Sequence, residues 1–166
     1  GYIEQLDDEL LRISKESFDA LSFNCYALSP DHEKMNHALE ISGLPMIIGE
    51  YHFGTVDRGL AQSLWQVNSQ KERGDAFRYY TENAFAHRGL IGTGWFRWID
   101  QNINGRTDGE NYNCGFIDVT DRPYPYMVDA AIEAAKSLYE IHSGTKTPFH
   151  QAPNAVGHSP IPDLWE

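Results

Sequence analysis

Residues 44–59, LPMIIGEYHFGTVDRG, decide the fold. The apolar run Met46–Ile48 is bounded by a proline and a glycine, which is typical of a buried β-strand. Glu50 follows one step later. Because side chains alternate along a strand, we expect Glu50 to share one face with Met46 and Ile48. The spacing then places a carboxylate at the mouth of whatever that face encloses. A strand-end glutamate in a solvated loop is the alternative.

The composition restricts the class of protein. The chain has 166 residues, a length that suits one domain, and 41% of them are hydrophobic, enough to bury a core. The 13 lysines and arginines are outnumbered by 24 aspartates and glutamates, so the formal charge is −11. Nucleic acids and anionic membranes bind basic surfaces, and neither is expected as a partner. No apolar run approaches the roughly 18 residues that a membrane span needs.

The two cysteines, Cys25 and Cys114, form neither a disulfide framework nor a metal-ligand spacing. Cys25 lies in an expected strand, where a buried free cysteine behaves as a small apolar residue. We therefore expect two free, structural thiols.

Helical and strand patterns alternate along the chain, and Ser69-x-x-Glu72 has the spacing of a capping box at one helix start. The expected helices cover residues 4–17, 30–41, 69–87 and 125–144, and the expected strands cover residues 18–28, 44–50 and 90–99. Residues 145–166 are rich in proline and are expected to form an extended tail. This alternation is typical of an α/β fold with parallel strands. An open doubly wound sheet and a segment of a (β/α)8 barrel both fit, although three strands are far short of eight.

Polar and aromatic residues gather at the C-terminal ends of the three expected strands, where both architectures place their working groups. The strands end, in chain order, with Asn24 and Tyr26, with Glu50 and His52, and with Trp95, Trp98, Asp100 and Gln101. Sugars present flat apolar faces to aromatic rings and hydroxyls to amides, imidazoles and carboxylates. The combination therefore favours a carbohydrate ligand.

Four strings carry a resemblance to a known family: IIGEYHFGTVDRG, GWFRWIDQ, GRTDGENYNCGF and VTDRPYP. Together and in this order they resemble the C-terminal part of β-agarases and related retaining glycosidases, whose catalytic domain is a (β/α)8 barrel. The resemblance extends from about residue 18 to residue 143. It implies that the three expected strands are strands six, seven and eight of such a barrel, and that residues 1–144 are a partial catalytic domain.

The resemblance also implies a role for Glu50. In that clan the nucleophile is a glutamate at the end of strand seven, a position that Glu50 occupies, and the acid/base is a glutamate at the end of strand four. A retaining glycosidase needs both carboxyl groups, about 5–5.5 Å apart. This chain has no counterpart of strand four, so it would supply only the nucleophile half. Tyr26 is expected to orient Glu50 by a hydrogen bond; a core aromatic is the alternative.

Further residues are expected to contact the substrate. They are Asn24, His52, Trp95, Trp98, Gln101, Asp108, Glu110 and Asn111. Scaffolding of a loop is an equal alternative for His52. Trp95 and Trp98 are three residues apart and face opposite ways on one strand, so we expect Trp95 to stack on a sugar and Trp98 to pack on a helix. The acids of the last loop do not fit the Ca²⁺-binding loop pattern, so no metal and no other cofactor is expected. Asp57 and Arg58 are expected to form a structural ion pair.

The expected function is that of a glycoside hydrolase that cleaves β-galactosidic linkages of agarose-like polysaccharide or oligosaccharide by a retaining double displacement. Its partners would be the carbohydrate and strands one to five of the barrel, from the parent protein or from a companion chain. Without them the isolated chain should be inactive, and unstable or self-associating. The family implies a secreted or periplasmic location, and the acidic N-terminus, GYIEQLDDEL, shows no signal peptide. The alternative is a non-catalytic fragment that binds carbohydrate or completes a barrel.

Overall fold

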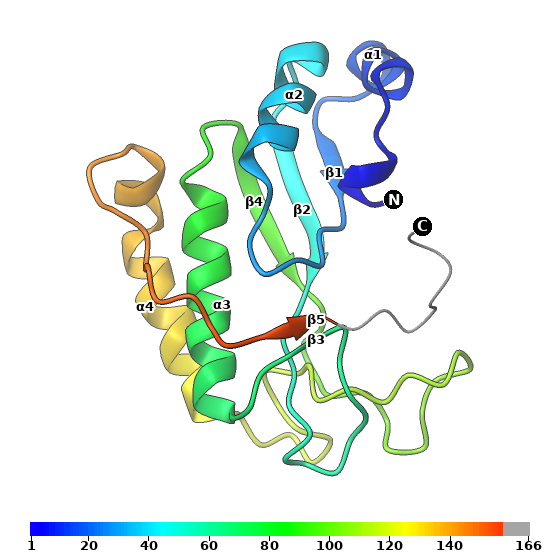
Figure 1. The fold of residues 1–166 in the computed structure, drawn as a ribbon, viewed down its shortest axis with the longest axis vertical. Coiled ribbons are helices and arrows are strands. Elements are labelled where there is room, and N and C mark those ends of the chain that lie inside the picture. Colours follow the sequence, from blue (N-terminus) through cyan, green and yellow to red (C-terminus); the bar gives the residue numbers. More distant parts are fainter. Residues whose placement is uncertain (158–166) are drawn as a thin grey trace.

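Three parallel strands form the centre of the structure, a computed structural model in which residues 1–157 are described (Figure 1). They are β1 (Leu21–Phe23), β2 (Met46–Tyr51) and β4 (Leu90–Trp95), and they lie in the order β1-β2-β4. Leu21 pairs with Met46, and Met46 pairs with Leu90 on its other side. The α/β architecture with parallel strands that the sequence predicts is confirmed.

Helices connect and flank these strands. They are η1 (Ile3–Gln5), α1 (Asp8–Ser17), α2 (His32–Ser42), α3 (Gln70–Phe85) and α4 (Pro125–His142). The predicted start of α3 is confirmed, since the Ser69 hydroxyl accepts a hydrogen bond from the Glu72 N–H at 3.2 Å. The helix expected for residues 4–17 is instead interrupted, because Asp7 caps a new helix by accepting from the Leu10 N–H at 2.8 Å. None of the helices in residues 1–157 is long and apolar enough to cross a membrane.

The helices cover one face of the sheet. Met46, Ile48 and Leu90 are completely buried on that face, in one core with side chains of α2, α3 and α4. Figure 1 shows α3 beside the sheet and α4 on the far side of α3. On the opposite face, called the open face below, Ser22 is exposed and its strand partner Ile47 is half-buried. Burial of apolar surface on the helical side therefore stabilises the sheet.

An irregularity in the pairing of β2 with β4 sets the direction of Glu50. Between Ile48 and Tyr51, β2 uses one residue more than the paired stretch of β4. Such a bulge breaks the alternation of side chains. Ile48 and Tyr51 are both buried, whereas Glu50 is half-buried and accepts a hydrogen bond from Tyr26. The expectation that Glu50 shares a face with Met46 and Ile48 is wrong, because the bulge turns Glu50 to the open face.

Two strands are shorter than their apolar patterns predict. β1 covers Leu21–Phe23 of the expected residues 18–28, and β4 ends at Trp95. Beyond this point the carbonyl of Trp98 accepts a hydrogen bond from the N–H of Phe116, in a loop, at 2.8 Å. The strand therefore ends where its backbone partners pass from β2 to a loop.

Residues 145–157 cross α3 and return to the end of the sheet (Figure 1). The Glu82 carboxylate of α3 accepts a backbone hydrogen bond from this segment at 2.7 Å. The segment ends in β5 (Val156–Gly157), which pairs antiparallel with β3 (Trp65–Gln66). Strands of two residues leave no periodic pattern in a sequence, which explains why neither was predicted. Residues 158–166 of the expected tail lie outside the described residues.

Both cysteines are free and buried, as the sequence predicts. Burial raises the pKa of the Cys114 thiol to about 12, and it also raises the pKa of the Cys25 thiol. The thiolate is the reactive form, so neither residue is a nucleophile at neutral pH.

Candidate active site

Tyr26 and Glu50 meet on the open face at the C-terminal ends of β1 and β2. The Tyr26 hydroxyl donates a hydrogen bond to Glu50 Oε2 at 2.9 Å. The backbone holds the same pair of strand ends together, since the Cys25 N–H donates to the Glu50 carbonyl at 3.0 Å. The structure therefore brings together the two residues that the sequence predicts to act together, and it leaves Glu50 partly accessible.

The phenol of Tyr26 serves only as a donor in this contact. Burial raises the pKa of Tyr26 well above its usual value, and the charge of Glu50 and the hydrogen bond to it raise the pKa further. The phenol therefore stays protonated at any pH at which the protein works. One oxygen of Glu50 is held by a neutral donor, while its charge is not neutralised by a cation at this contact.

His52 lies behind Tyr26 and is completely buried. Its ring meets the Tyr26 ring edge-on at 5.1 Å and the Tyr112 ring at 5.6 Å. Its Nε2 accepts a hydrogen bond from the Leu64 N–H at 3.3 Å. Burial lowers the pKa of His52 to about 3, so the imidazole is neutral. These contacts fit the scaffolding alternative for His52, and contact with a sugar stays a prediction.

Asn24 lies on the open face next to the catalytic candidates. Its Oδ1 is 3.0 Å from the position that a Cβ on Gly49 would occupy, so the glycine gives the Asn24 side chain its space. Asn24 is half-buried, and its backbone pairs in parallel with Tyr2. The sequence did not indicate Tyr2, because it precedes the first helical pattern and belongs to no periodic segment.

Trp95, the last residue of β4, and Trp98, three residues later, lie in different surroundings. The Trp95 ring packs edge-on against Phe77 of α3 at 5.4 Å, and its indole N–H donates to the Cys114 carbonyl at 2.6 Å. Trp98 is 68% exposed and stacks on Phe116 at 5.8 Å. The expectation that Trp98 packs on a helix is wrong, because the strand ends at Trp95 and alternation no longer applies. Stacking of Trp95 on a sugar stays a prediction.

The loop after β4 holds the other predicted substrate contacts. They are Gln101, Asp108, Glu110 and Asn111. Gln101 is completely buried, and its amide donates to Glu110 at 2.7 Å and accepts from the Tyr112 N–H at 2.6 Å. Asp108 and Glu110 both pair with Arg106, at 2.6 and 3.3 Å. Asn111 accepts a hydrogen bond from the Ala61 N–H at 3.0 Å. Gln101 thus fastens the loop, and Asp108, Glu110 and Asn111 keep accessible surface.

A buried polar cluster, called the loop anchor below, fixes the loops that follow β2 and β4 in the chain to α3. It consists of Thr55, Gln70, Arg73, Asp100, Asn113 and Tyr124. The Asp100 carboxylate accepts from the Tyr124 hydroxyl at 2.6 Å and from the Asn113 amide at 3.0 Å. Arg73 is completely buried, donates to Asn113 at 2.9 Å and lies over the Tyr124 ring at 4.8 Å.

No local pattern predicts the role of Arg73, because an arginine in a helix usually faces solvent. Its partners come from distant loops, which no local spacing predicts. The expected ion pair between Asp57 and Arg58 is confirmed, with N and O atoms 3.9 Å apart, and Gln70 also donates to Asp57 at 2.7 Å. Among residues 1–157, no three His, Cys, Asp or Glu side chains lie close enough together to hold a metal ion.

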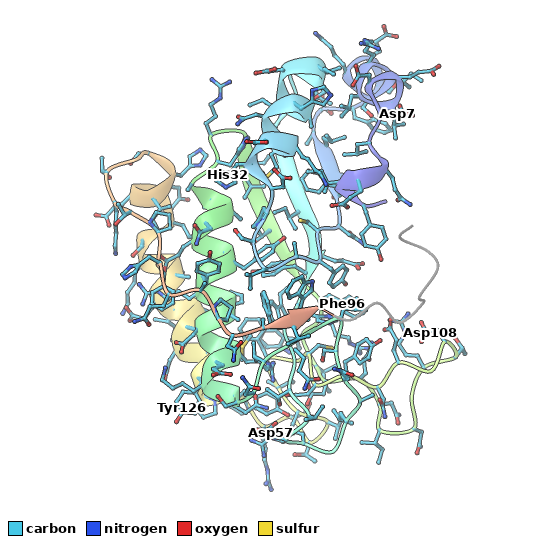
Figure 2. The ribbon with its side chains drawn as sticks, in the orientation of Figure 1. Asp7, His32, Asp57, Phe96, Asp108 and Tyr126 are labelled. Atoms are coloured by element: carbon cyan, nitrogen blue, oxygen red, sulfur yellow. The ribbon has the colours of Figure 1, made fainter. Side chains whose placement is uncertain are left out.

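Figure 2 places the loops relative to the sheet. Asp57, Phe96 and Asp108 all lie beyond the tips of β2 and β4, on the side toward which these strands point, whereas Asp7 lies at the opposite end of the molecule. The C-terminal strand ends and their loops therefore build one candidate site, as expected for an α/β protein.

The chain has known relatives, although no family model matches it. β-Agarase A of Vibrio sp. (strain JT0107) is 39% identical over 128 residues, which are 73% of this chain and 13% of that protein. A solved exo-β-agarase is 36% identical with a TM-score of 0.76, over 81% of this chain and 18% of that chain. Another solved agarase is 37% identical with a TM-score of 0.78, over 82% of this chain and 20% of that chain. The resemblance found in the sequence is confirmed, and this chain spans 13% of the length of that curated relative.

Proposed function

We propose that this chain, which is homologous to a segment of the β-agarases, supplies the nucleophile half of a retaining glycosidase site. The observation that carries the proposal is the contact between Tyr26 and Glu50. A carboxylate at a strand end, partly accessible and held by one neutral donor at 2.9 Å, suits a nucleophile. The hydrogen bond from Tyr26 holds one carboxylate oxygen, Oε2, and so fixes the direction of the side chain.

The proposed reaction is a double displacement. A Glu50 carboxylate oxygen attacks the anomeric carbon and forms a glycosyl ester, while the bond from that carbon to the leaving oxygen breaks. A second carboxylic acid, in the rest of the barrel, gives the leaving oxygen its proton. The resulting carboxylate then takes a proton from water, which attacks the anomeric carbon and releases Glu50. Both displacements invert the anomeric carbon, so its configuration is retained overall.

The rest of the barrel is the proposed partner of this chain. The three parallel strands correspond to strands six, seven and eight of a (β/α)8 barrel, in which helices cover the outside and side chains fill the inside. The helical coverage of one sheet face and the open face on the other support this arrangement. The missing strands would cover the open face and bring the second carboxyl group to Glu50.

The proposed substrate is a β-galactosidic polysaccharide or oligosaccharide of the agarose type. Support comes from the names of the relatives, which are agarases, and from the mixed surface around the site. Trp98 offers an exposed ring, and Asn24, Asp108 and Glu110 offer polar groups for sugar hydroxyls. A polysaccharide of the agarose type is too large to enter a cell intact, so we place the enzyme outside the cytoplasm, secreted or periplasmic.

A second candidate function is a fragment that completes a barrel or binds carbohydrate without catalysis. The observation that favours it is the state of Glu110, the other glutamate near the site. Its carboxylate is engaged by both Gln101 and Arg106, which leaves it unsuited to donate a proton to a leaving group. Without a second carboxyl group, general acid catalysis worth roughly 10²–10⁴-fold is lost.

Covalent trapping separates these functions. The complete enzyme, with all strands of the barrel, would be incubated with an activated 2-fluoro β-galactoside, digested and mapped by mass spectrometry. We expect the label on Glu50, and we expect Glu50→Gln to abolish labelling while Glu110→Gln leaves it in place. Label on another residue would overturn the nucleophile assignment, and no label together with unimpaired sugar binding would favour the non-catalytic function.

A further inference from the structure

Residues 145–157, called the strap below, are attached to α3 at a buried charge. Glu82 is completely buried, and its carboxylate accepts from the Phe149 N–H at 2.7 Å and pairs with Arg78. The Asn83 amide donates to the Phe149 carbonyl at 3.1 Å, and the Arg78 guanidinium lies over the Phe149 ring at 4.7 Å. A buried carboxylate is stable only when it is paired and hydrogen-bonded, so Glu82 fixes the course of the strap at Phe149.

The end of the strap pairs with the loop that follows β2. Val156 lies opposite Gln66 of β3, and Gly157 lies opposite Trp65. A Cβ at position 157 would lie 3.0 Å from the Trp65 ring, so a glycine there lets the two chains approach each other closely. Figure 1 shows the strap crossing α3 to reach this pair. The strap therefore connects α3 to a loop of the site.

β3 holds the loop after β2 by its other edge. The Gly54 N–H donates to the Trp65 carbonyl and the Val67 N–H donates to the Gly54 carbonyl, both at 2.9 Å. The Trp65 ring also meets the Phe53 ring edge-on at 6.4 Å. Short strands that pair on one edge alone are marginally stable. The pairing with β5 on the second edge therefore keeps β3 in place.

The loop reaches Tyr26 through His52. Leu64 directly precedes β3, and its N–H donates to Nε2 of His52 at 3.3 Å. Because Nε2 accepts, the proton of the neutral imidazole is on Nδ1. The His52 ring lies edge-on against the Tyr26 ring at 5.1 Å, and the Tyr26 hydroxyl donates to Glu50 at 2.9 Å. A continuous series of contacts thus extends from the strap to Glu50.

We propose that the strap is a positioning element of the active site, which holds the loop after β2 against His52 and so keeps Tyr26 on Glu50. The inference rests on the proposed glycosidase function, and it adds residues 145–157 to the catalytic unit that the sequence places in residues 1–144. A single edge-on ring contact contributes only about 0.5–1.5 kcal/mol, so His52 keeps Tyr26 in place only when it is itself held from behind. Misplacement of a catalytic group by about 1 Å can cost 100-fold in rate.

Replacement of the strap tests its role. In the complete enzyme, with all strands of the barrel, residues 145–157 would be exchanged for a glycine–serine linker of equal length. We expect kcat on an agarose oligosaccharide to fall roughly 3- to 30-fold with little change in KM, because the strap acts on the nucleophile and not on binding. Phe149→Pro removes both the ring and the N–H that Glu82 accepts from, and it decides if the linker variant does not fold. Parental kcat of the folded variants would overturn the proposal.

A double-mutant cycle separates positioning from a loss of stability. If the strap acts through the Tyr26 hydroxyl, Phe149→Pro should cost less than about 2-fold in an enzyme that already carries Tyr26→Phe. In the Tyr139→Phe background it should keep its full effect, because Tyr139 is 91% exposed on α4. An equal loss in both backgrounds would overturn the proposal, since a strap that only stabilises the fold acts independently of Tyr26. Full turnover by Glu50→Gln would refute the proposed function by itself, whatever the strap variants do.

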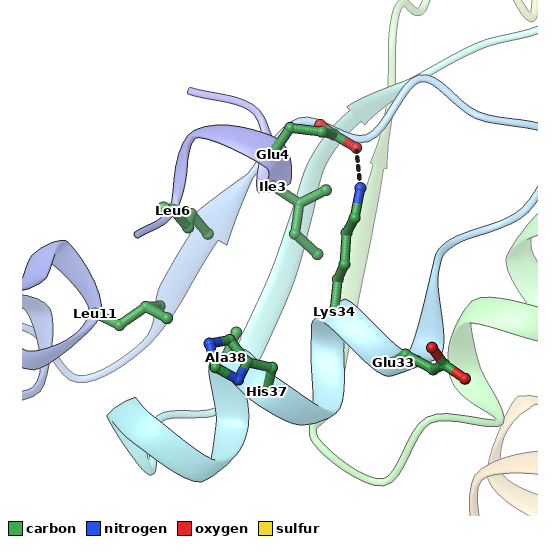
Figure 3. A pocket seen from close by; sticks show the side chains of 8 residues that line it. All are labelled: Ile3, Glu4, Leu6, Leu11, Glu33, Lys34, His37 and Ala38. Atoms are coloured by element: carbon green, nitrogen blue, oxygen red, sulfur yellow. Dashed lines mark hydrogen bonds and ion pairs between the residues drawn. The ribbon is translucent and has the colours of Figure 1, made fainter. Parts of the chain in front are cut away.

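Chemical labelling of His52 provides a readout that does not depend on turnover. His52 is 1% exposed, and diethyl pyrocarbonate acylates only accessible imidazoles. Labelling mapped by mass spectrometry should be slow in the parent and several-fold faster in Phe149→Pro. The matched control is Lys34→Met, which breaks the ion pair with Glu4 at 3.5 Å beside a pocket of about 360 Å³ (Figure 3). That pair is half-exposed and contributes little, so the control should label like the parent. Equal labelling of His52 in Phe149→Pro and the control would contradict the positioning role.

Discussion

The hydroxyl of Tyr26 lies 2.9 Å from Oε2 of Glu50, although the two residues are 24 positions apart and lie at the ends of neighbouring strands. The contact exists because β1 and β2 are parallel, so that both chains arrive at the same edge of the sheet. The bulge in β2 then turns Glu50 toward the face on which Tyr26 lies. One hydrogen bond therefore depends on the topology and on a local irregularity.

Removal of the Tyr26 hydroxyl should impair catalysis without unfolding the protein. Tyr26→Phe keeps the ring against His52 but leaves the carboxylate without its donor, and hydrogen bonds to charged groups contribute about 1.5–3 kcal/mol. We expect kcat/KM of the complete enzyme to fall roughly 10- to 100-fold. Steady-state kinetics on an agarose oligosaccharide would measure it, with Tyr139→Phe as the control. Activity equal to that of the control would exclude a positioning role for Tyr26.

Two glycines of β4 should respond in opposite ways to alanine. A Cβ on Gly94 would lie 2.5 Å from the Gly49 carbonyl oxygen, a backbone atom that cannot move aside without disturbing the bulge. A Cβ on Gly92 would lie 3.7 Å from Ile47, an ordinary contact. We expect Gly94→Ala to destabilise the protein by about 1–3 kcal/mol or more, and Gly92→Ala to be neutral or slightly stabilising. Thermal midpoints of the complete enzyme carrying either substitution measure the difference, and equal midpoints would contradict the close packing of β4 on β2.

The buried, neutral His52 should make stability fall in acid. Its pKa is lowered to about 3 in the folded protein, against about 6.5 when unfolded. Between these values the unfolded chain binds a proton that the folded protein does not, so stability is full above pH 6.5 and is lost as the pH falls toward 3. The contribution of His52 alone should lower the free energy of unfolding by about 2 kcal/mol at pH 5 relative to pH 7. In urea titrations of the complete enzyme, His52→Gln should flatten this pH dependence, whereas His150→Gln, at an exposed position, should not.

Replacement of Arg73 should loosen the site loops. Arg73→Met removes the hydrogen bonds to Gln70, Asn113 and the Gly115 carbonyl, and it leaves the Asp100 charge without its buried cation. Breaking a buried ionic cluster from one side costs about 3–5 kcal/mol. In the complete enzyme we expect a lower thermal midpoint and faster proteolysis within residues 96–124. The control is Arg12→Met, whose side chain is 65% exposed, and identical proteolysis of both variants would refute the anchoring role.

The isolated chain should not behave as an independent domain. Its sheet has three strands and an open face, and unpaired sheet edges pair with other chains. We expect the 166-residue chain to self-associate or to unfold without a cooperative transition. Sedimentation velocity and a thermal melt test this expectation. A monomer that melts in one sharp transition would show that the helical face alone stabilises the fold.

Much of the site could be predicted from local patterns, because the end of an apolar run marks the end of a strand. Three features each depend on neighbours in sequence: the apolar run before Glu50, the N-cap of α3 at Ser69, and the alternation of helices with strands. Parallel connection follows from that alternation. Given parallel strands, Tyr26 and Glu50 had to lie at one edge, so their proximity was predictable as well.

Other features depend on contacts between distant segments. The faces of Glu50 and Trp98 were predicted wrongly, because alternation assumes an unbroken ladder, and the ladder is bulged in β2 and ends at Trp95. Arg73 in the loop anchor and Tyr2 beside β1 had no local signal at all.

The sequence by itself determined which residues form strands and helices, that the strands are parallel, and that Glu50 lies at a strand end. Only the tertiary structure decided which face Glu50 occupies, what holds it, and which distant residues surround it. The physical reason is that secondary structure follows from periodic burial and capping within a few residues. The face on which a side chain lies, and the residues around it, follow instead from backbone pairing across the sheet. One extra residue in β2 moves the Glu50 side chain to the other face.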